Sequence, residues 1–230
     1  MEHVALHEHQ NGLIELRADR PPANAMDLTL LADLLEAIEL LRGETPRALV
    51  LAGRPGFFSA GVDLKSVPGY DGEQQRAMVA HINAMALGVY ELPCPVVGAI
   101  TGHAVAGGLV LALCTDLRIA SSAGRYGLTE VQVGIGYPQG AIGVVRAELG
   151  PHAARRLALG SDLLSASECL HLGVFDELAE PDDVLPRALE LATSLAAFPP
   201  ELDARTKSEL RAATAAHLRA AAAEDPLLEI

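Results

Sequence analysis

Phe57-Phe58-Ser59-Ala60-Gly61-Val62-Asp63-Leu64-Lys65 is one of two glycine-centred stretches that decide the fold of this chain. The other is Gly102-His103-Ala104-Val105-Ala106-Gly107-Gly108. Each follows a run of apolar residues, and its glycines remove side-chain bulk and let backbone N–H groups turn toward a ligand. Two such N–H groups that converge on one oxygen form an oxyanion hole. For Gly107 and Gly108, the alternative is that they only allow a helix to pack closely on a sheet.

The segments around these stretches alternate between strand and helix patterns. Short apolar or alternating runs predict strands, and apolar residues at helical spacing predict helices. Such alternation is typical of stacked βαβ turns around a parallel sheet, so the predicted fold class is α/β. The predicted strands cover residues 13–17, 48–52, 96–100 and 117–120, and the predicted helices cover 28–41, with Asp27 as N-cap, 78–89 and 107–114.

Beyond residue 140 the sequence is mostly helical. Ser165-Ala166-Ser167-Glu168 is typical of a capping box, residues 174–178 fit a short strand, and Pro199-Pro200 separates two helices rich in Ala and Leu. We expect one domain whose core covers residues 1–195. A helical region over residues 196–230 is expected to pack on the core or on another subunit.

Composition and charge limit the classes of function. The chain has 230 residues, half of them hydrophobic, which is enough for a sizeable core. Its formal net charge of −13 argues against binding to nucleic acid or to an anionic membrane, because both need a basic surface. No stretch approaches the roughly 20 apolar residues of a membrane span, and the N-terminus lacks the pattern of a signal peptide. We therefore expect a cytoplasmic protein.

Several common site patterns are missing from the sequence. The three cysteines are far apart among apolar neighbours, which favours buried, reduced thiols over disulfides or a metal site. His3, His7 and His9 lie near a terminus that we expect to fray, so no metal site is predicted. The glycines do not have the spacing of a dinucleotide or phosphate-binding loop, and no Gly-x-Ser-x-Gly motif is present.

Glu130 is the carboxylate best placed for chemistry. It lies in a glycine-flanked, apolar loop, where loss of solvent would raise its pKa toward that of a useful general base. The alternative is a solvated loop glutamate. We expect Asp116 to accept hydrogen bonds from backbone or hydroxyl groups and Asp63 to cap the turn that follows it. His103 lies near the glycines, and we expect it to pack or hydrogen-bond without reacting.

Taken together, these segments resemble the crotonase superfamily, also called the enoyl-CoA hydratase/isomerase family. The resemblance implies a spiral of stacked ββα units with a helical C-terminal region. It also implies a homotrimer or a dimer of trimers and an acyl-CoA or enoyl-CoA thioester as ligand, with coenzyme A as part of the substrate and no separate cofactor. The matching segments are residues 20–25, 58–65, 102–116 and 126–134.

The resemblance also assigns site residues. The backbone N–H groups of Val62 and Gly107 would form the oxyanion hole. The backbone of Ala60, Val62 and Leu64 would line the bent coenzyme A near its adenine, and Lys65 would lie near its phosphates. Backbone donors and one or two cations can hold an anionic ligand even on an acidic protein.

One departure from the family pattern concerns the carboxylates. Hydratases of the family use two glutamates, and here the first position is Val110, so that only the second, Glu130, is kept. A single base facing an oxyanion hole suits proton transfer within a 3-enoyl-CoA that gives a 2-enoyl-CoA. The spacing from Gly134 to Pro138 is similar to that of monofunctional enoyl-CoA isomerases. The alternatives are a hydratase, thioesterase or decarboxylase of the same superfamily using Tyr137, His103 or another carboxylate, and an inactive acyl-CoA-binding protein.

Overall fold

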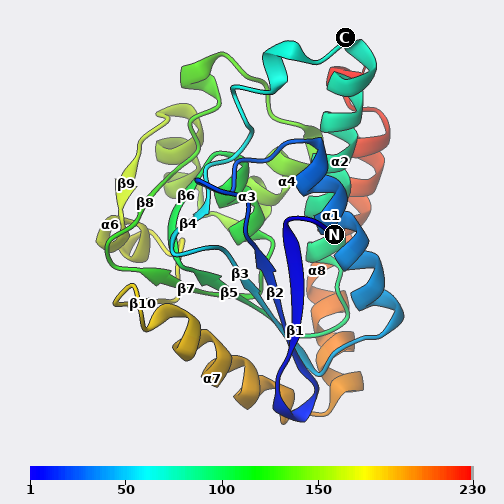
Figure 1. Cartoon of the computed structure of the whole chain (residues 1–230), viewed down its shortest axis with the longest axis vertical. Coiled ribbons are helices and arrows are strands. Elements are labelled where there is room, and N and C mark those ends of the chain that lie inside the picture. The colour runs from blue at the N-terminus through cyan, green and yellow to red at the C-terminus, as the bar shows by residue number, and fades with distance from the viewer. Residues whose placement is uncertain (229–230) are drawn as a thin grey trace.

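Two β-sheets and the helices that cover them make up residues 1–228, which are the residues that the computed structural model describes (Figure 1). The larger sheet has six strands in the order β1-β2-β3-β5-β7-β10, and all neighbours are parallel except β1 and β2. The smaller sheet has the order β4-β6-β8-β9, with β9 antiparallel to β8. The strands are β1 (Val4–Glu8), β2 (Leu13–Ala18), β3 (Ala48–Ala52), β4 (Gly56–Ser59), β5 (Val96–Ile100), β6 (Gly102–Val105), β7 (Leu117–Ser121), β8 (Arg125–Gly127), β9 (Leu164–Ser165) and β10 (Glu177–Ala179).

The first turn places β1 and β2 in the larger sheet, and the next two turns each contribute one strand to each sheet and then a helix. Strand β3 is followed by β4 and α2, and β5 is followed by β6 and α3. This order confirms the expected stacking of ββα units and the α/β fold class. The α-helices are α1 (Leu28–Gly43), α2 (Gly72–Tyr90), α3 (Gly107–Leu113), α4 (Gln139–Glu148), α5 (Pro151–Ala154), α6 (Ala166–His171), α7 (Val184–Ala196) and α8 (Pro200–Ala223). Short helical turns are η1 (Gln10–Gly12), η2 (Val67–Gly69), η3 (Val131–Val133), the π-helical η4 (Arg155–Leu159) and η5 (Pro226–Leu228).

Both faces of the larger sheet are covered, which explains why its central strands are apolar throughout. In β3, Leu49 and Leu51 pack into the main core with helices α1 to α4, whereas Val50 packs toward α7 on the opposite face. Figure 1 shows α7 crossing that face beneath β5, β7 and β10. The alternation of side chains along each strand therefore fixes two separate cores.

Several helix ends follow the predicted sequence signals, whereas α2 begins at Gly72, with Asp71 as its N-cap, and not at residue 78. The Asp27 carboxylate accepts a hydrogen bond from the Leu30 N–H at 2.9 Å and begins α1. Ser165 and Glu168 form the predicted capping box of α6. Pro199 and Pro200 separate α7 from α8, and α8 then packs on α2 and α4.

Two expectations about strands need correction. The N-terminus does not fray, because residues 4–8 form β1 and pair along their whole length with β2, so His7 lies within a sheet. The short strand expected at 174–178 is instead β10, Glu177–Ala179, because Val174 and Phe175 point into the main core and Glu177 is the first residue to pair with β7.

The remaining polar and thiol expectations are confirmed. Asp116 accepts the Val96 N–H at 2.7 Å and also forms ion pairs with Lys207 and Arg211 of α8. Cys94, Cys114 and Cys169 are buried and free, and burial raises the pKa of each thiol to about 12. Within residues 1–228, no helix combines the length and the apolar character needed to cross a membrane.

Candidate active site

The turn at Gly61 brings the first glycine stretch back toward α1. Gly61 has φ of +77°, a conformation that favours glycine, and its N–H donates to Ser59 Oγ at 3.1 Å. The Ser59 hydroxyl in turn donates to the Asn24 carbonyl at 2.7 Å. The Gly61 carbonyl accepts the Met26 N–H at 2.7 Å. Two of these hydrogen bonds therefore tie the turn to residues 24–26, and the third lies within the turn.

Arg20 and Asn24 anchor the same turn from the preceding segment. The buried Asn24 amide donates to the Ala18 carbonyl at 2.8 Å and to the Phe58 carbonyl at 3.1 Å. One guanidinium nitrogen of Arg20 lies 3.0 Å from Asp63. Burial acts to raise the pKa of Asp63, but hydrogen bonds from the Lys65 N–H and from the side chains of Ser66 and Arg20 outweigh it, so the pKa is lowered. Asp63 thus caps the turn, as predicted.

The second glycine stretch makes a sharp turn between β6 and α3. Ala106 has φ of +52° and ψ of −128°, a strained conformation for a residue with a Cβ, and its N–H donates to the Gly127 carbonyl at 2.8 Å. A Cβ on Gly108 would lie 2.2 Å from the Ser59 carbonyl oxygen, so only glycine permits this approach to β4. The packing alternative therefore holds for Gly108. A Cβ on Gly107 would meet only Met26 Sδ, at 3.4 Å, and the Gly61 Cα, at 3.8 Å.

The two glycine turns touch each other. A Cβ on Gly61 would lie 3.0 Å from the Gly107 nitrogen and 2.8 Å from Ala106 Cβ. Neither the Val62 N–H nor the Gly107 N–H donates a hydrogen bond to another residue within 1–228. The fold thus brings two predicted site residues together and leaves both of their N–H groups available.

Glu130 follows β8, which pairs with β6 immediately before the second glycine turn. Its side chain is buried, with 8% of the residue exposed, and Oε2 has no hydrogen-bond partner within residues 1–228. Burial raises the pKa of this carboxyl group. The solvated-loop alternative is therefore wrong, and Glu130 has the environment expected of a general base.

Tyr137 is a second buried polar group at this place. Its hydroxyl also lacks a hydrogen-bond partner within the described residues. Burial raises the pKa of the phenol, and the nearby charge of Glu130 raises it further. The Tyr137 hydroxyl thus lies close to the Glu130 carboxyl, in the segment that joins β8 to α4.

These features can be compared with known proteins. A family model described as enoyl-CoA hydratase/isomerase matches residues 8–228. The chain belongs to the enoyl-CoA hydratase/isomerase family. Probable enoyl-CoA hydratase EchA17 of Mycobacterium tuberculosis is 34% identical over 200 residues, which are 86% of this chain and 76% of that protein. Human mitochondrial enoyl-CoA delta isomerase 1 is 31% identical over 211 residues, 90% of this chain and 70% of that protein. The crystal structure of probable enoyl-CoA hydratase EchA3 of M. tuberculosis superposes with a TM-score of 0.90 at 28% identity. The match covers 96% of this chain and 93% of the EchA3 chain.

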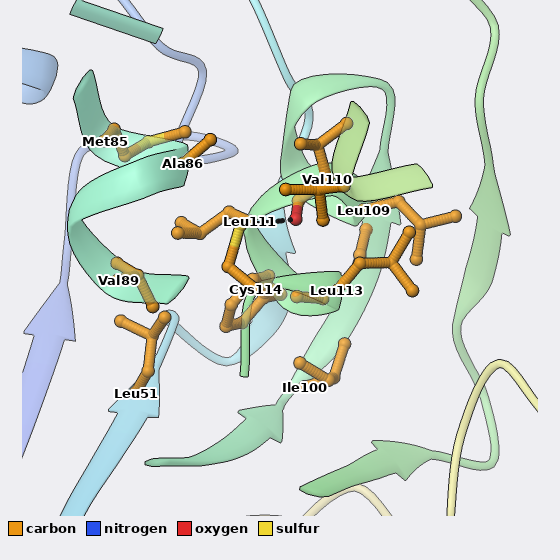
Figure 2. Close-up of a cluster of buried hydrophobic side chains, with 14 of the residues drawn as sticks. Leu51, Met85, Ala86, Val89, Ile100, Leu109, Val110, Leu111, Leu113 and Cys114 are labelled. Carbon is orange, nitrogen blue, oxygen red and sulfur yellow. Dashed lines mark hydrogen bonds between the residues drawn. The ribbon is translucent and has the colours of Figure 1, made fainter. Parts of the chain in front are cut away.

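Val110 occupies the position where the resemblance to family hydratases leads one to expect a glutamate. It lies in the first turn of α3 and is 0% exposed. Figure 2 shows it beside Leu109 and Leu111 in a cluster of buried hydrophobic side chains that also includes Met85 and Val89 of α2. No charge is therefore supplied from this position.

The other predicted site residues follow the first glycine turn or lie in β6. The Ala60 N–H donates to the Ala23 carbonyl at 3.0 Å, whereas Leu64 and Lys65 are exposed. His103 accepts the Arg125 N–H at 3.0 Å and packs against Phe57, with ring centroids 4.9 Å apart and the ring planes tilted by 47°. His103 therefore packs and hydrogen-bonds, as predicted.

A metal site would need several ligating side chains close together. Within residues 1–228, no three His, Cys, Asp or Glu side chains lie together in a way that could hold a metal ion. Asn24, Ser59 and Arg20 had no predicted individual roles, although the segment 20–25 was part of the resemblance. The signal for Asn24 is the Pro-Pro-Ala-Asn run, in which a polar residue follows a rigid turn.

Proposed function

We propose that the protein is an enoyl-CoA isomerase that moves the double bond of a 3-enoyl-CoA to the 2-position, with Glu130 as its base. The environment of Glu130 carries this proposal. Four carboxylate residues within 1–228 are buried, namely Glu15, Asp33, Glu130 and Asp225. The other three accept hydrogen bonds from protein groups, whereas Glu130 keeps one oxygen unpartnered. A buried, unsatisfied carboxylate is costly to keep, and a substrate proton can satisfy it.

The proton transfer needs one base and two N–H donors. Ionised Glu130 removes a proton from the α-carbon of the thioester, and the electron pair moves onto the carbonyl oxygen as an enolate. The N–H groups of Val62 and Gly107 stabilise that oxygen. Protonated Glu130 then returns the proton to the γ-carbon, the double bond forms between the α- and β-carbons, and the carboxylate is regenerated. No water is consumed.

We assign coenzyme A recognition to the residues after the first glycine turn. Ala60 and Leu64 offer backbone groups, and exposed Lys65 offers a cation that can reach a phosphate. The hydrogen bond from the Lys65 N–H to Asp63 at 3.0 Å holds this part of the chain in a fixed turn. Coenzyme A is then part of the substrate, and the mechanism needs no separate cofactor.

Hydration of a 2-enoyl-CoA is a second candidate reaction. The observation that favours it is the Tyr137 hydroxyl, which is buried and unpartnered beside Glu130 and could help hold a water molecule. The name of EchA17 is in line with this reaction, whereas the name of the human delta isomerase is in line with the first. Apolar Val110 favours isomerisation, because a second carboxylate is missing where water would be activated.

We also propose that the C-terminal helical region builds a homotrimer or a dimer of trimers. Exposed apolar side chains on and just before α8 support this assembly: Phe198 is 54% exposed, Leu202 62% and Leu210 80%. Sedimentation equilibrium of the wild type and of Leu210→Glu tests it. A monomeric wild type would refute the assembly.

The test of the reaction compares three proteins on two substrates. Absorbance of the conjugated thioester is followed with 3-hexenoyl-CoA and with 2-hexenoyl-CoA for wild type, Glu130→Gln and Glu15→Gln. Glu130→Gln should lower isomerisation on the order of 10²–10⁴-fold, because it keeps the shape and removes the base. Glu15→Gln is the matched control, since Glu15 is also a buried glutamate, 2% exposed, but its partners are His9 and Arg17.

Each outcome separates the candidate functions. Conjugation that appears with wild type and Glu15→Gln but not with Glu130→Gln supports the isomerase. Loss of conjugation from 2-hexenoyl-CoA shows hydration instead. Binding of both esters in calorimetry without turnover identifies an acyl-CoA-binding protein, and full activity of Glu130→Gln refutes the role of Glu130.

A further inference from the structure

Asp225 lies near the end of the chain and is nevertheless among its most buried charged residues, with 1% exposed. One carboxylate oxygen accepts the side-chain amide of Asn83 at 2.9 Å and the backbone N–H of Gln139 at 2.7 Å. The other accepts the N–H of Leu227 at 3.0 Å. These donors are neutral groups from α2, from α4 and from the chain end itself. Three distant parts of the sequence therefore meet at one carboxylate.

This contact supplies the cap of α4. The residue before the helix is Pro138, whose side chain cannot accept a hydrogen bond, so the first N–H groups of α4 need partners from elsewhere. Asp225 accepts the N–H of Gln139, and Asn83 accepts the N–H of Gly140 at 2.8 Å. A carboxylate at a helix N-terminus is also favoured by the helix dipole. The start of α4 is thus held by the end of the chain.

The residues after Asp225 contact the loop that precedes α4. A Cβ on Gly136 would lie 3.4 Å from one methyl carbon of Leu227, so Leu227 packs directly over this glycine. The short turn η5 also runs along α2, and the red end of α8 can be followed beside α2 in Figure 1. The chain end therefore fixes Gly136 by packing and Gln139 by a hydrogen bond. Tyr137, whose hydroxyl lies close to the Glu130 carboxyl, lies between these two fixed points.

We propose that Asp225 is a positioning residue for Glu130. The segment from Asp225 to Leu228, here called the strap, holds residues 136–139 against α2 and so places the Tyr137 hydroxyl beside the Glu130 carboxyl. This inference rests on the proposed function, because it assumes that Glu130 is the base. It predicts that loosening the strap slows the chemical step and leaves binding of the coenzyme A part unchanged, since Ala60, Leu64 and Lys65 lie in a different loop.

The experiment uses the full chain with Asp225→Asn, a second variant truncated after Glu224, and Asp33→Asn as matched control. Asparagine keeps the shape of Asp225 but turns an NH₂ group toward at least one donor. Asp33 is also a buried carboxylate that accepts backbone N–H groups, from Glu2 and His3 at 2.6 Å, and both residues precede β1. Two readouts are measured: amide hydrogen exchange over residues 134–142, and kcat and KM with 3-hexenoyl-CoA.

We expect faster exchange over residues 134–142 in Asp225→Asn and in the truncated chain, but not in Asp33→Asn. We also expect kcat to fall on the order of 10- to 10²-fold with KM unchanged, because a misplacement of about 1 Å has effects of this size. Unchanged exchange in both strap variants would overturn the proposal, and so would faster exchange with wild-type kcat. If the wild type isomerises no 3-enoyl-CoA, the proposed function fails, and exchange still decides whether the strap holds the loop, since it needs no substrate.

Discussion

Replacing Gly108 by alanine adds one methyl group, but we expect it to slow turnover strongly. The new Cβ would lie 2.2 Å from the Ser59 carbonyl oxygen and 2.8 Å from its carbonyl carbon. Both are backbone atoms of β4 and cannot rotate away, so α3 must move by about 1 Å to reach an ordinary contact. The Gly107 N–H moves with α3, whereas the Val62 N–H stays with the first glycine turn. The proposed oxyanion hole then loses its geometry, and we expect kcat/KM to fall on the order of 10²-fold.

The assay measures isomerisation of 3-hexenoyl-CoA by Gly108→Ala, with thermal unfolding followed by circular dichroism on the same samples. Overpacking should cost about 1–3 kcal/mol of unfolding free energy, which leaves a folded protein to assay. Gly43→Ala is the control, because no atom lies within 4 Å of a Cβ at this last residue of α1. Wild-type turnover by a folded Gly108→Ala protein would show that the closeness of α3 to β4 does not set the site.

Four further predictions concern charge and strain. Because burial raises the pKa of Glu130 and the base must be ionised, kcat/KM should fall with decreasing pH at a higher pH than an exposed glutamate would give. Above the raised pKa, Glu130 is ionised in a buried site, and this ionisation destabilises the folded state. Glu130→Gln removes that cost, so it should raise Tm at neutral pH and not at acid pH, as measured by scanning calorimetry. Ala106→Gly should raise Tm by about 2–4 °C, because the φ of +52° is strained for alanine; an unchanged or lower Tm would contradict this. Arg20→Ala should cost about 2 kcal/mol in urea unfolding, since it leaves Asp27 and Asp63 without their shared cation, and a loss near zero would contradict the anchor role.

The central fold could be predicted because its strands are buried on both faces. Residues 48–52 and 96–100 are continuous apolar runs, and the preceding helix α1 has clear apolar spacing and an N-cap at Asp27. The second sheet was not predicted, because β8 has three residues and β9 has two, which is too short for any periodic pattern. The strand β1 was missed because most of its residues are exposed and because the segment with His3, His7 and His9 was expected to fray.

The site was predictable only where the residue type itself indicates the backbone conformation. Gly61 and Gly107 indicated the two turns in this way. The apolar, glycine-flanked loop around Glu130 was consistent with either a desolvated or a solvated carboxylate, because its burial depends on the pairing of β8 with β6 and on Tyr137. The contact between Asn83 and Asp225 joins residues 142 positions apart, and neither residue belongs to a recognisable motif. Such contacts arise from tertiary packing alone.

The meeting of the two glycine turns also limits how this chemistry can be moved or dissected. Gly61 follows a strand of the smaller sheet, and Gly107 follows the neighbouring strand of that sheet, after a full turn of the chain. Neither segment contains the pair of donors by itself. A peptide or fragment that ends before β6 would therefore keep one glycine turn and have no paired donors, and a graft into another protein would have to carry both strands together with the turn of the chain that joins them.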